Sequence, residues 1–215
     1  MTNNGNDQEG EASTQRFDQA AAGWEANPLR LALATAVAAA IRRTLPADHA
    51  AMHALEYGCG TGLVCRTLSP SLARITAMDT SPGMLRELET RLRAEAIDNV
   101  VPQLHDLTQA PLPGASFDLV YSSMTLHHIP ALELLLQRLF ALLNPGGLLA
   151  LADLAPEDGT FHEDKTGVAH FGIDPQGVLA SLARLGGCDG RFSEVHVIEK
   201  GPRRYPVLLS WCRKG

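Results

Sequence analysis

Three glycines at alternate positions are the residues of this chain best suited to hold a cofactor. Gly58, Gly60 and Gly62 follow a short apolar segment that ends at Tyr57. Glycine has no Cβ, so the backbone can turn sharply there and approach a ligand closely. The apolar spacing of residues 62–69 indicates a helix whose first N–H groups are open to an anionic group. The pattern predicts a loop that binds a nucleotide-like cofactor.

A carboxylate follows the next apolar segment of the chain. Residues 73–78 read as a second strand ending at Asp79, where an acidic side chain can accept both hydroxyls of a ribose. The glycine spacing departs from the dinucleotide pattern G-x-G-x-x-G, because the third glycine comes one residue early and Leu63 stands where that pattern has glycine. This departure argues against NAD or FAD.

Further runs follow in a fixed order along about half of the chain. They are the glycine loop Glu56–Gly62, then Met78–Leu85, His105–Leu107, Ser116–Val120, Leu126–Ile129 and Leu143–Gly147. As a set, they resemble the motifs of the class I S-adenosylmethionine (SAM)-dependent methyltransferases, and most closely the small-molecule, type 11/12-like branch. The resemblance implies SAM as the cofactor and methyl transfer to a small-molecule acceptor as the activity.

The resemblance also implies which residues bind SAM, with the glycine loop beside its methionyl end. Asp79 would accept from the ribose hydroxyls and Asp106 from the adenine amino group, unless Asp106 is only a turn residue. Ser122 and Ser123 would approach the methionine portion. Glu56 would fix the ammonium group or the loop, or it would cap a strand end, and both interpretations stay open. The full set is Glu56, Gly58, Gly60, Thr61, Gly62, Asp79, Thr80, Asp106, Leu107, Ser122 and Ser123.

Four of the histidines are candidate catalytic residues on the acceptor side. His127 and His128 begin a short helix after the fourth expected strand, and His162 and His170 lie in the lid-like connection 154–173. They could be ordinary polar residues of a lid, groups that orient or deprotonate the acceptor, or ligands of a metal that chelates it. The spacing of His162 and His170 matches no short zinc motif, so no metal site is assigned.

The elements that must position these residues alternate along the chain. Alternation of strands and helices predicts a parallel α/β sheet. By resemblance the sheet is Rossmann-like and seven-stranded, with an antiparallel last strand and helices on both faces. Strands are expected near 52–57, 73–78, 99–104, 117–122, 146–153, 192–198 and 206–212. Helices are expected near 62–69, 81–95, 131–143 and 174–186, after two N-terminal helices within residues 15–46.

Composition limits the function further. The 215 residues fit one methyltransferase domain over 15–215, and the net charge of −6 shows no basic footprint for nucleic acid. The four cysteines form no C-x-x-C pair, and Cys59 is expected to be a buried thiol. A monomer or a loose homodimer fits this length and charge.

The beginning of the chain and its apolar runs predict where the protein acts. Residues 1–14 are polar and lack the basic and apolar parts of a secretory signal, so we expect a disordered tail. No apolar run reaches about 18 residues, so no membrane span is expected and the cytoplasm is the default compartment.

Two functions other than small-molecule methylation stay open. A protein methyltransferase would share every cofactor motif, and a regulatory protein could bind SAM without turnover. The segment after Val120 reads Tyr-Ser-Ser-Met rather than the D/N-P-P-Y/F of many amino-methylating enzymes. This difference disfavours a planar amide or adenine nitrogen as the acceptor.

Overall fold

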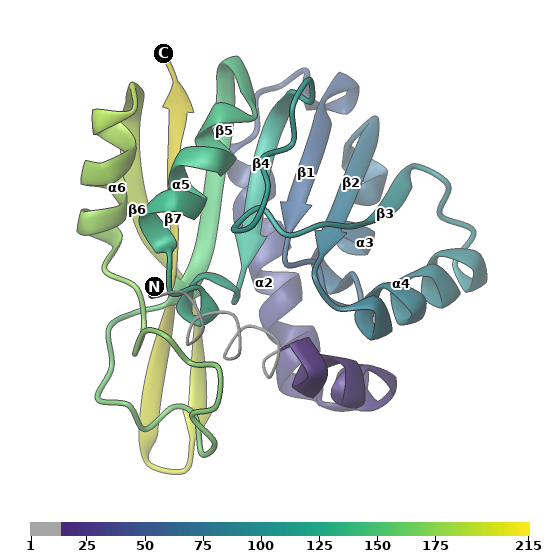
Figure 1. Ribbon diagram of the computed structural model, residues 1–215, viewed down its shortest axis with the longest axis vertical. Helices are drawn as coiled ribbons and strands as arrows, with labels where there is room; N and C mark the ends of the chain where they lie inside the picture. The colour runs from purple at the N-terminus through teal and green to yellow at the C-terminus, as the bar shows by residue number, and fades with distance from the viewer. Residues whose placement is uncertain (1–13) are drawn as a thin grey trace, which may run out of the picture.

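The alternation of strands and helices produces a seven-stranded sheet in the computed structural model, which describes residues 14–215 (Figure 1). The strand order is β3-β2-β1-β4-β5-β7-β6; β7 runs antiparallel to β5 and β6, and the other pairs are parallel. The strands are β1 (His53–Tyr57), β2 (Arg74–Asp79), β3 (Val100–Leu104), β4 (Phe117–Ser123), β5 (Leu143–Leu154), β6 (Gly187–Lys200) and β7 (Arg203–Lys214). The expected fold class is confirmed, whereas the expected tail lies, apart from Thr14, outside the described residues.

Helices cover both faces of this sheet, with α5 and α6 in front and α2 and α3 behind in Figure 1. Residues 14–20 are also helical and continue into a 3-10 turn. The α-helices are α2 (Pro28–Thr44), α3 (Leu63–Leu68), α4 (Pro82–Ala94), α5 (Leu132–Ala141) and α6 (Pro175–Arg184). The 3-10 helices are η1 (Ala21–Ala26), η2 (His49–Ala51), η3 (Ser69–Ser71) and η4 (Leu126–His128).

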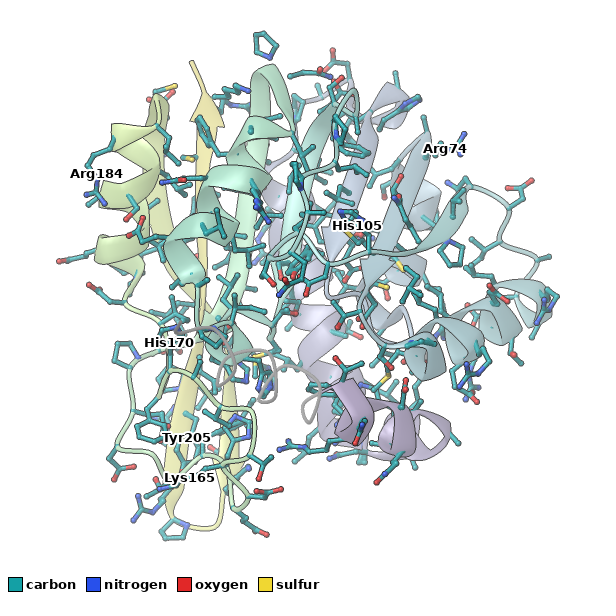
Figure 2. All side chains as sticks on the ribbon, viewed as in Figure 1. Arg74, His105, Lys165, His170, Arg184 and Tyr205 are labelled. Carbon is teal, nitrogen blue, oxygen red and sulfur yellow. The ribbon has the colours of Figure 1, made fainter. Side chains whose placement is uncertain are left out.

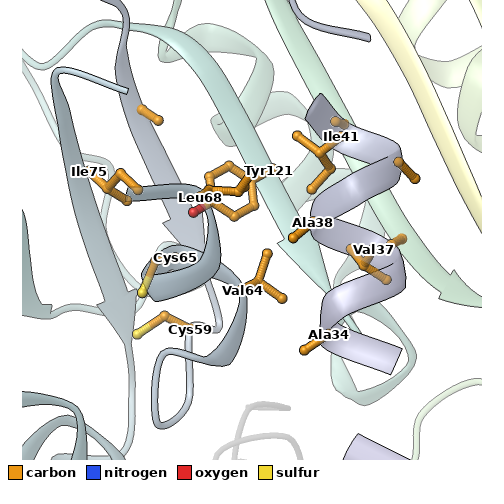
Figure 3. Close-up of a cluster of buried hydrophobic side chains, with 14 of the residues drawn as sticks. Ala34, Val37, Ala38, Ile41, Cys59, Val64, Cys65, Leu68, Ile75 and Tyr121 are labelled. Carbon is orange, nitrogen blue, oxygen red and sulfur yellow. The ribbon is translucent and has the colours of Figure 1, made fainter. Parts of the chain in front are cut away.

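Each face of the sheet has its own apolar core. On one face, Val37 and Ile41 of α2 pack with Leu68 of α3 and with strand residues such as Ile75 (Figure 3). On the other face, α5 and α6 pack against β4 and β5. A parallel strand covered on both sides is apolar nearly throughout, which explains the continuous apolar runs in β4 and β5.

Short polar side chains set the starts of three helices. Asn27 accepts from the Leu29 N–H before α2, and Ser81 accepts from the Met84 N–H before α4. Asp174 accepts from the N–H groups of Gln176 and Gly177 before α6. Each of these caps is followed by a proline at the first helical position, where a missing N–H costs nothing. The Ser81 cap starts α4 directly after Asp79, so it fixes the backbone beside the expected ribose-binding carboxylate.

Three strands are longer than the sequence predicts: β5, β6, and β7, which extends beyond the expected 206–212 at both ends. β5 begins at Leu143 because a register shift between Phe117 and Leu119 accommodates the turn residues 144–147 within the pairing. β6 begins at Gly187, although residues 187–191 are polar and lack an apolar alternation. Backbone hydrogen bonds to β7 therefore determine that part of β6, and the side-chain pattern does not show it.

The carboxyl ends of the parallel strands meet at one edge of the sheet, which is the lower edge in Figure 1. The glycine loop follows β1, η4 follows β4, and the lid of residues 155–174 follows β5. Ligands of open parallel sheets bind at this edge. The N-terminal helical segment 14–26 also reaches it, because Asp18 accepts from the Ser81 hydroxyl at 2.5 Å and from the Gly83 N–H at 2.7 Å.

None of the helices within residues 14–215 is long and apolar enough to cross a membrane.

Candidate active site

The glycine loop is held in a conformation that needs glycine. Gly58, Gly60 and Gly62 all have positive φ, at +72°, +54° and +83°. A Cβ on Gly58 would lie 2.2 Å from the Thr125 hydroxyl oxygen, so the segment after β4 packs directly on the loop. The N–H groups of Gly58 and Cys59 donate to the Met78 carbonyl at 2.8 and 3.0 Å and join the loop to β2.

Asp79 connects the glycine loop to the start of α4. Its Oδ2 accepts from the Gly60 N–H at 2.7 Å and its Oδ1 from the Ser81 N–H at 2.9 Å. Burial raises the pKa of Asp79, and these backbone N–H groups oppose the shift. Thr80, between these two contacts, is partly exposed. A carboxylate oxygen has two acceptor sites, so each oxygen of Asp79 can still accept from a ligand hydroxyl.

The loop fits a polar cofactor in two further ways. The Thr61 hydroxyl is buried and has no hydrogen-bond partner among residues 14–215. A Cβ on Gly60 would meet nothing closer than the Met84 sulfur at 3.9 Å, so the space beside this residue is open. Buried hydroxyls normally find a partner, so Thr61 marks a place where a ligand group belongs.

Asp106 serves as a turn residue with one oxygen. Its Oδ1 accepts from the Thr108 N–H and from the Thr108 hydroxyl, both at 2.7 Å, which leaves Oδ2 outside the turn. Leu107 is buried, and its carbonyl accepts from Arg138. Asp106 can therefore serve both expected roles, because Oδ1 holds the turn and Oδ2 can accept from a ligand.

Two of the expected cofactor residues are used inside the sheet. The Ser122 hydroxyl is fully buried and donates to the Tyr57 carbonyl at 2.7 Å, so it joins β4 to β1. The Glu56 side chain is buried on the face of α3 and accepts from the Tyr121 hydroxyl at 3.3 Å. Burial raises the pKa of Glu56 to about 8. Ser123 is partly exposed at the end of β4.

His127 is buried against an aspartate. Its Nδ1 lies 2.6 Å from Oδ1 of Asp153, and its backbone N–H donates to Oδ2 at 3.3 Å. Burial works against ionisation of Asp153, but His127 and two backbone N–H groups lower its pKa overall. In the neutral form of the ring, donation from Nδ1 to this carboxylate places the lone pair on Nε2. This Nε2 is buried without a hydrogen-bond partner in the described part of the chain.

His128 and His162 lie beside His127. The ring centroid of His127 is 4.1 Å from that of His128 and 5.1 Å from that of His162. One ring nitrogen from each of the three histidines lies within 4.8 Å of the other two. Burial, helped by the neighbouring His127, lowers the pKa of His128 to about 3 and that of His162 to about 4, so both are neutral at physiological pH.

The lid brings only His162, and not His170, of its two candidate histidines to this cluster. The His170 Nε2 lies 2.9 Å from the Ile129 carbonyl, and its backbone N–H donates to the His127 carbonyl at 3.0 Å. Glu163 and Asp164 are exposed. Figure 2 shows His170 on the lid with Lys165 and Tyr205 below it. His170 therefore holds the lid on the segment after η4, and its side chain is not one of the three that converge.

Aromatic residues from the N-terminal segment and the lid surround the cluster. The ring centroid of Phe17 is 5.3 Å from that of His128, and that of Phe161 is 4.7 Å from that of His162. Trp24 packs against Phe17 and under the Arg30 guanidinium. Sequence reasoning missed Phe17 and Thr125 at the site, since neither belongs to a motif. Only the apolar spacing of residues 17–24 marked this segment as a packed helix.

Comparison with known proteins identifies the family of this arrangement. A model of the methyltransferase domain matches residues 29–185. An uncharacterized methyltransferase of Schizosaccharomyces pombe is 34% identical over 143 residues, covering 60% of this chain and 50% of its own. A malonyl-[acyl-carrier protein] O-methyltransferase of Enterobacter lignolyticus is 36% identical over 118 residues, covering 55% and 45%. The chain thus spans about half the length of these curated relatives.

A solved structure matches nearly the whole chain. It is a complex of DhpI with S-adenosylhomocysteine (SAH), 25% identical, with a TM-score of 0.72 over 95% of this chain and 96% of the other. The demethylated cofactor in this neighbour agrees with the ligand expected from the glycine loop, Asp79 and the unpartnered Thr61 hydroxyl. The chain belongs to the class I SAM-dependent methyltransferases.

Proposed function

We propose that this protein methylates a hydroxyl oxygen of a small molecule that binds against His127, His128 and His162. The observation that carries this proposal is the pair of buried Nε2 atoms of His127 and His162, beside the segment that packs on the glycine loop; neither has a hydrogen-bond partner among the described residues 14–215. Neutral imidazole nitrogens accept a hydrogen bond from a hydroxyl. Burial keeps His128 and His162 uncharged, so their rings offer hydrogen-bond acceptors to a hydroxyl rather than a positive charge.

On the cofactor side, we propose that the glycine loop and Asp79 hold SAM. Each oxygen of Asp79 already accepts from one backbone N–H and would accept from one ribose hydroxyl at its second lone pair. The Thr61 hydroxyl would find its missing partner at the methionyl end, and Oδ2 of Asp106 would accept from the adenine amino group. We propose that Glu56 supports the glycine loop without contacting SAM, and that Ser122 serves only to join β4 to β1. When bound, SAM supplies an activated methyl group.

The chain itself must position the acceptor and exclude water. Asp153 fixes the tautomer of His127, so that its Nε2 lone pair faces the acceptor. The lid is tied over this position by two backbone N–H groups, of Ala169 and His170, that donate to the His127 carbonyl at 2.9 and 3.0 Å. Arg16 donates to the Thr166 carbonyl at 2.8 Å and joins the lid to the N-terminal segment.

One labelling experiment tests this function against its two rivals. The protein is incubated with SAM carrying a labelled methyl group and a cell extract, which is then separated into small molecules, proteins and nucleic acids. We expect label in the small-molecule fraction, bound to oxygen. Label in proteins would instead show a protein methyltransferase. Tight SAM binding without any transfer would show a regulatory protein.

Matched variants make the result specific to the site. His127→Gln should abolish most of the transfer, because it removes the lone pair that Asp153 orients. His53→Gln is the control, since His53 is exposed at the start of β1, at the opposite edge of the sheet. Equal loss of transfer in both variants, with SAM binding intact, would contradict the proposed acceptor site.

A further inference from the structure

The three histidines present more lone pairs than one hydroxyl can use. The Nε2 atoms of His127 and His162 are both buried, and neither has a hydrogen-bond partner among residues 14–215. Nδ1 of His128 lies 2.7 Å from the Gly167 carbonyl, so it carries the proton and Nε2 carries the lone pair. An acceptor hydroxyl donates one hydrogen bond, so at least one buried nitrogen would still be without a partner.

We propose that His127, His128 and His162 form a binding site for a divalent metal ion of the zinc class. Three imidazole nitrogens with one open position are a common ligand set for catalytic zinc. The contact between Asp153 and Nδ1 of His127 is the carboxylate–histidine arrangement that orients metal ligands, and the Gly167 carbonyl has the same position relative to His128.

The geometry is close to that of a loaded site. The ligand nitrogens lie within 4.8 Å of one another, whereas tetrahedral zinc separates its nitrogen ligands by about 3.4 Å. The nitrogens must therefore approach one another by at most about 1.4 Å, through rotation of the rings and movement of the lid that carries His162. With the ion bound, the oxygen of the acceptor would be the fourth ligand, and this metal–oxygen contact would replace the direct hydrogen bond to Nε2 of His127. Only this last step rests on the proposed function.

The test is metal binding by the chelator-treated protein, with no SAM and no turnover. Titration calorimetry with Zn²⁺ should show one ion per chain. Co²⁺ should give the strong visible absorption of a four-coordinate nitrogen site. His162→Ala should weaken Zn²⁺ binding at least about a hundredfold, and Asp153→Asn, which removes an orienting contact, should weaken it by about 10- to 100-fold. His53→Ala, at an exposed position on the opposite edge of the sheet, is the matched control and should bind as wild type.

Two results would overturn the metal site. One is the lack of stoichiometric Zn²⁺ binding by the folded wild-type chain, which would leave the cluster as a hydrogen-bonding site for the acceptor. The other is wild-type affinity in a folded His162→Ala variant, which would place the ion elsewhere. Labelled methyl transfer by the chelator-treated protein would separate the two proposals, because the proposed function would then survive without the ion.

Discussion

At the scale of single residues, Asp79 shows how one carboxylate can prepare a cofactor site. Its two oxygens accept from the N–H groups of Gly60 and Ser81, which belong to two different turns. Those bonds reduce the cost of burying a charge and join the loop to the start of α4. The carboxylate is therefore both part of the fold and a contact proposed for the ribose.

Asp79→Asn is expected to raise the Kd of SAM and of SAH by about tenfold to a hundredfold, because an amide nitrogen cannot accept a hydrogen bond. Titration calorimetry measures the change. Asp118→Asn is the control, since that carboxylate accepts from the His53 N–H at the opposite edge of the sheet. Unchanged affinity in folded Asp79→Asn protein would remove Asp79 from the cofactor site.

At the scale of elements, the N-terminal segment is held at the active-site edge by few contacts. Asp18 accepts from the Ser81 hydroxyl and the Gly83 N–H, so it caps α4 from outside that helix. Glu25 pairs with Arg66 of α3 at 2.6 Å. Together these contacts attach residues 14–26 to two helices that begin beside the cofactor loop.

Asp18→Ala should lower the free energy of unfolding by about 1 kcal/mol, the usual effect of losing a helix cap. Urea unfolding measures this change. Asp48→Ala is a suitable control, because Asp48 precedes η2 without a capping side-chain bond. If both variants lose the same stability, Asp18 does not act as a cap for α4.

At the scale of the whole molecule, three buried groups make stability depend on pH in opposite directions. Folding lowers the pKa of His162 to about 4 and that of His128 to about 3. Their contribution to the free energy of unfolding is therefore complete above pH 6.5, and it is lost as the pH falls toward these two values. The folded chain retains a proton on Glu56, so stability declines as the pH rises from 4.5 to about 8.

The summed contribution of these three groups to the free energy of unfolding has its maximum near pH 6.5. The two histidines raise it up to that pH, their ordinary pKa, and Glu56 lowers it above that pH. Above it, the free energy of unfolding should fall by up to about 1.4 kcal/mol per pH unit because of Glu56. Glu56→Gln should remove this fall, as urea unfolding at about pH 6.5 and pH 7.5 would show. A slope equal to that of wild type would mean that Glu56 is ionised in the folded protein.

Local patterns determined most of the fold. Apolar runs of strand length, helices started by Asn27-Pro28 and Ser81-Pro82, and the three glycines are short-range signals, and the structure has these elements near the expected residues. The strand ends place Gly60, Asp79 and Asp106 at one edge, because parallel strands share the position of their carboxyl ends. The starts of β5 and β6 escaped prediction, since pairing with β4 and β7 determines them.

The sequence by itself determined the sheet, the cofactor loop and the list of candidate histidines. Only the tertiary structure decided that His162, and not His170, joins His127 and His128, and that Asp153 pairs with the first of them. It also directed Ser122 into the sheet. The reason is physical: the direction of a side chain depends on strand register and on the path of a long lid, and both are set by contacts between residues far apart in the chain.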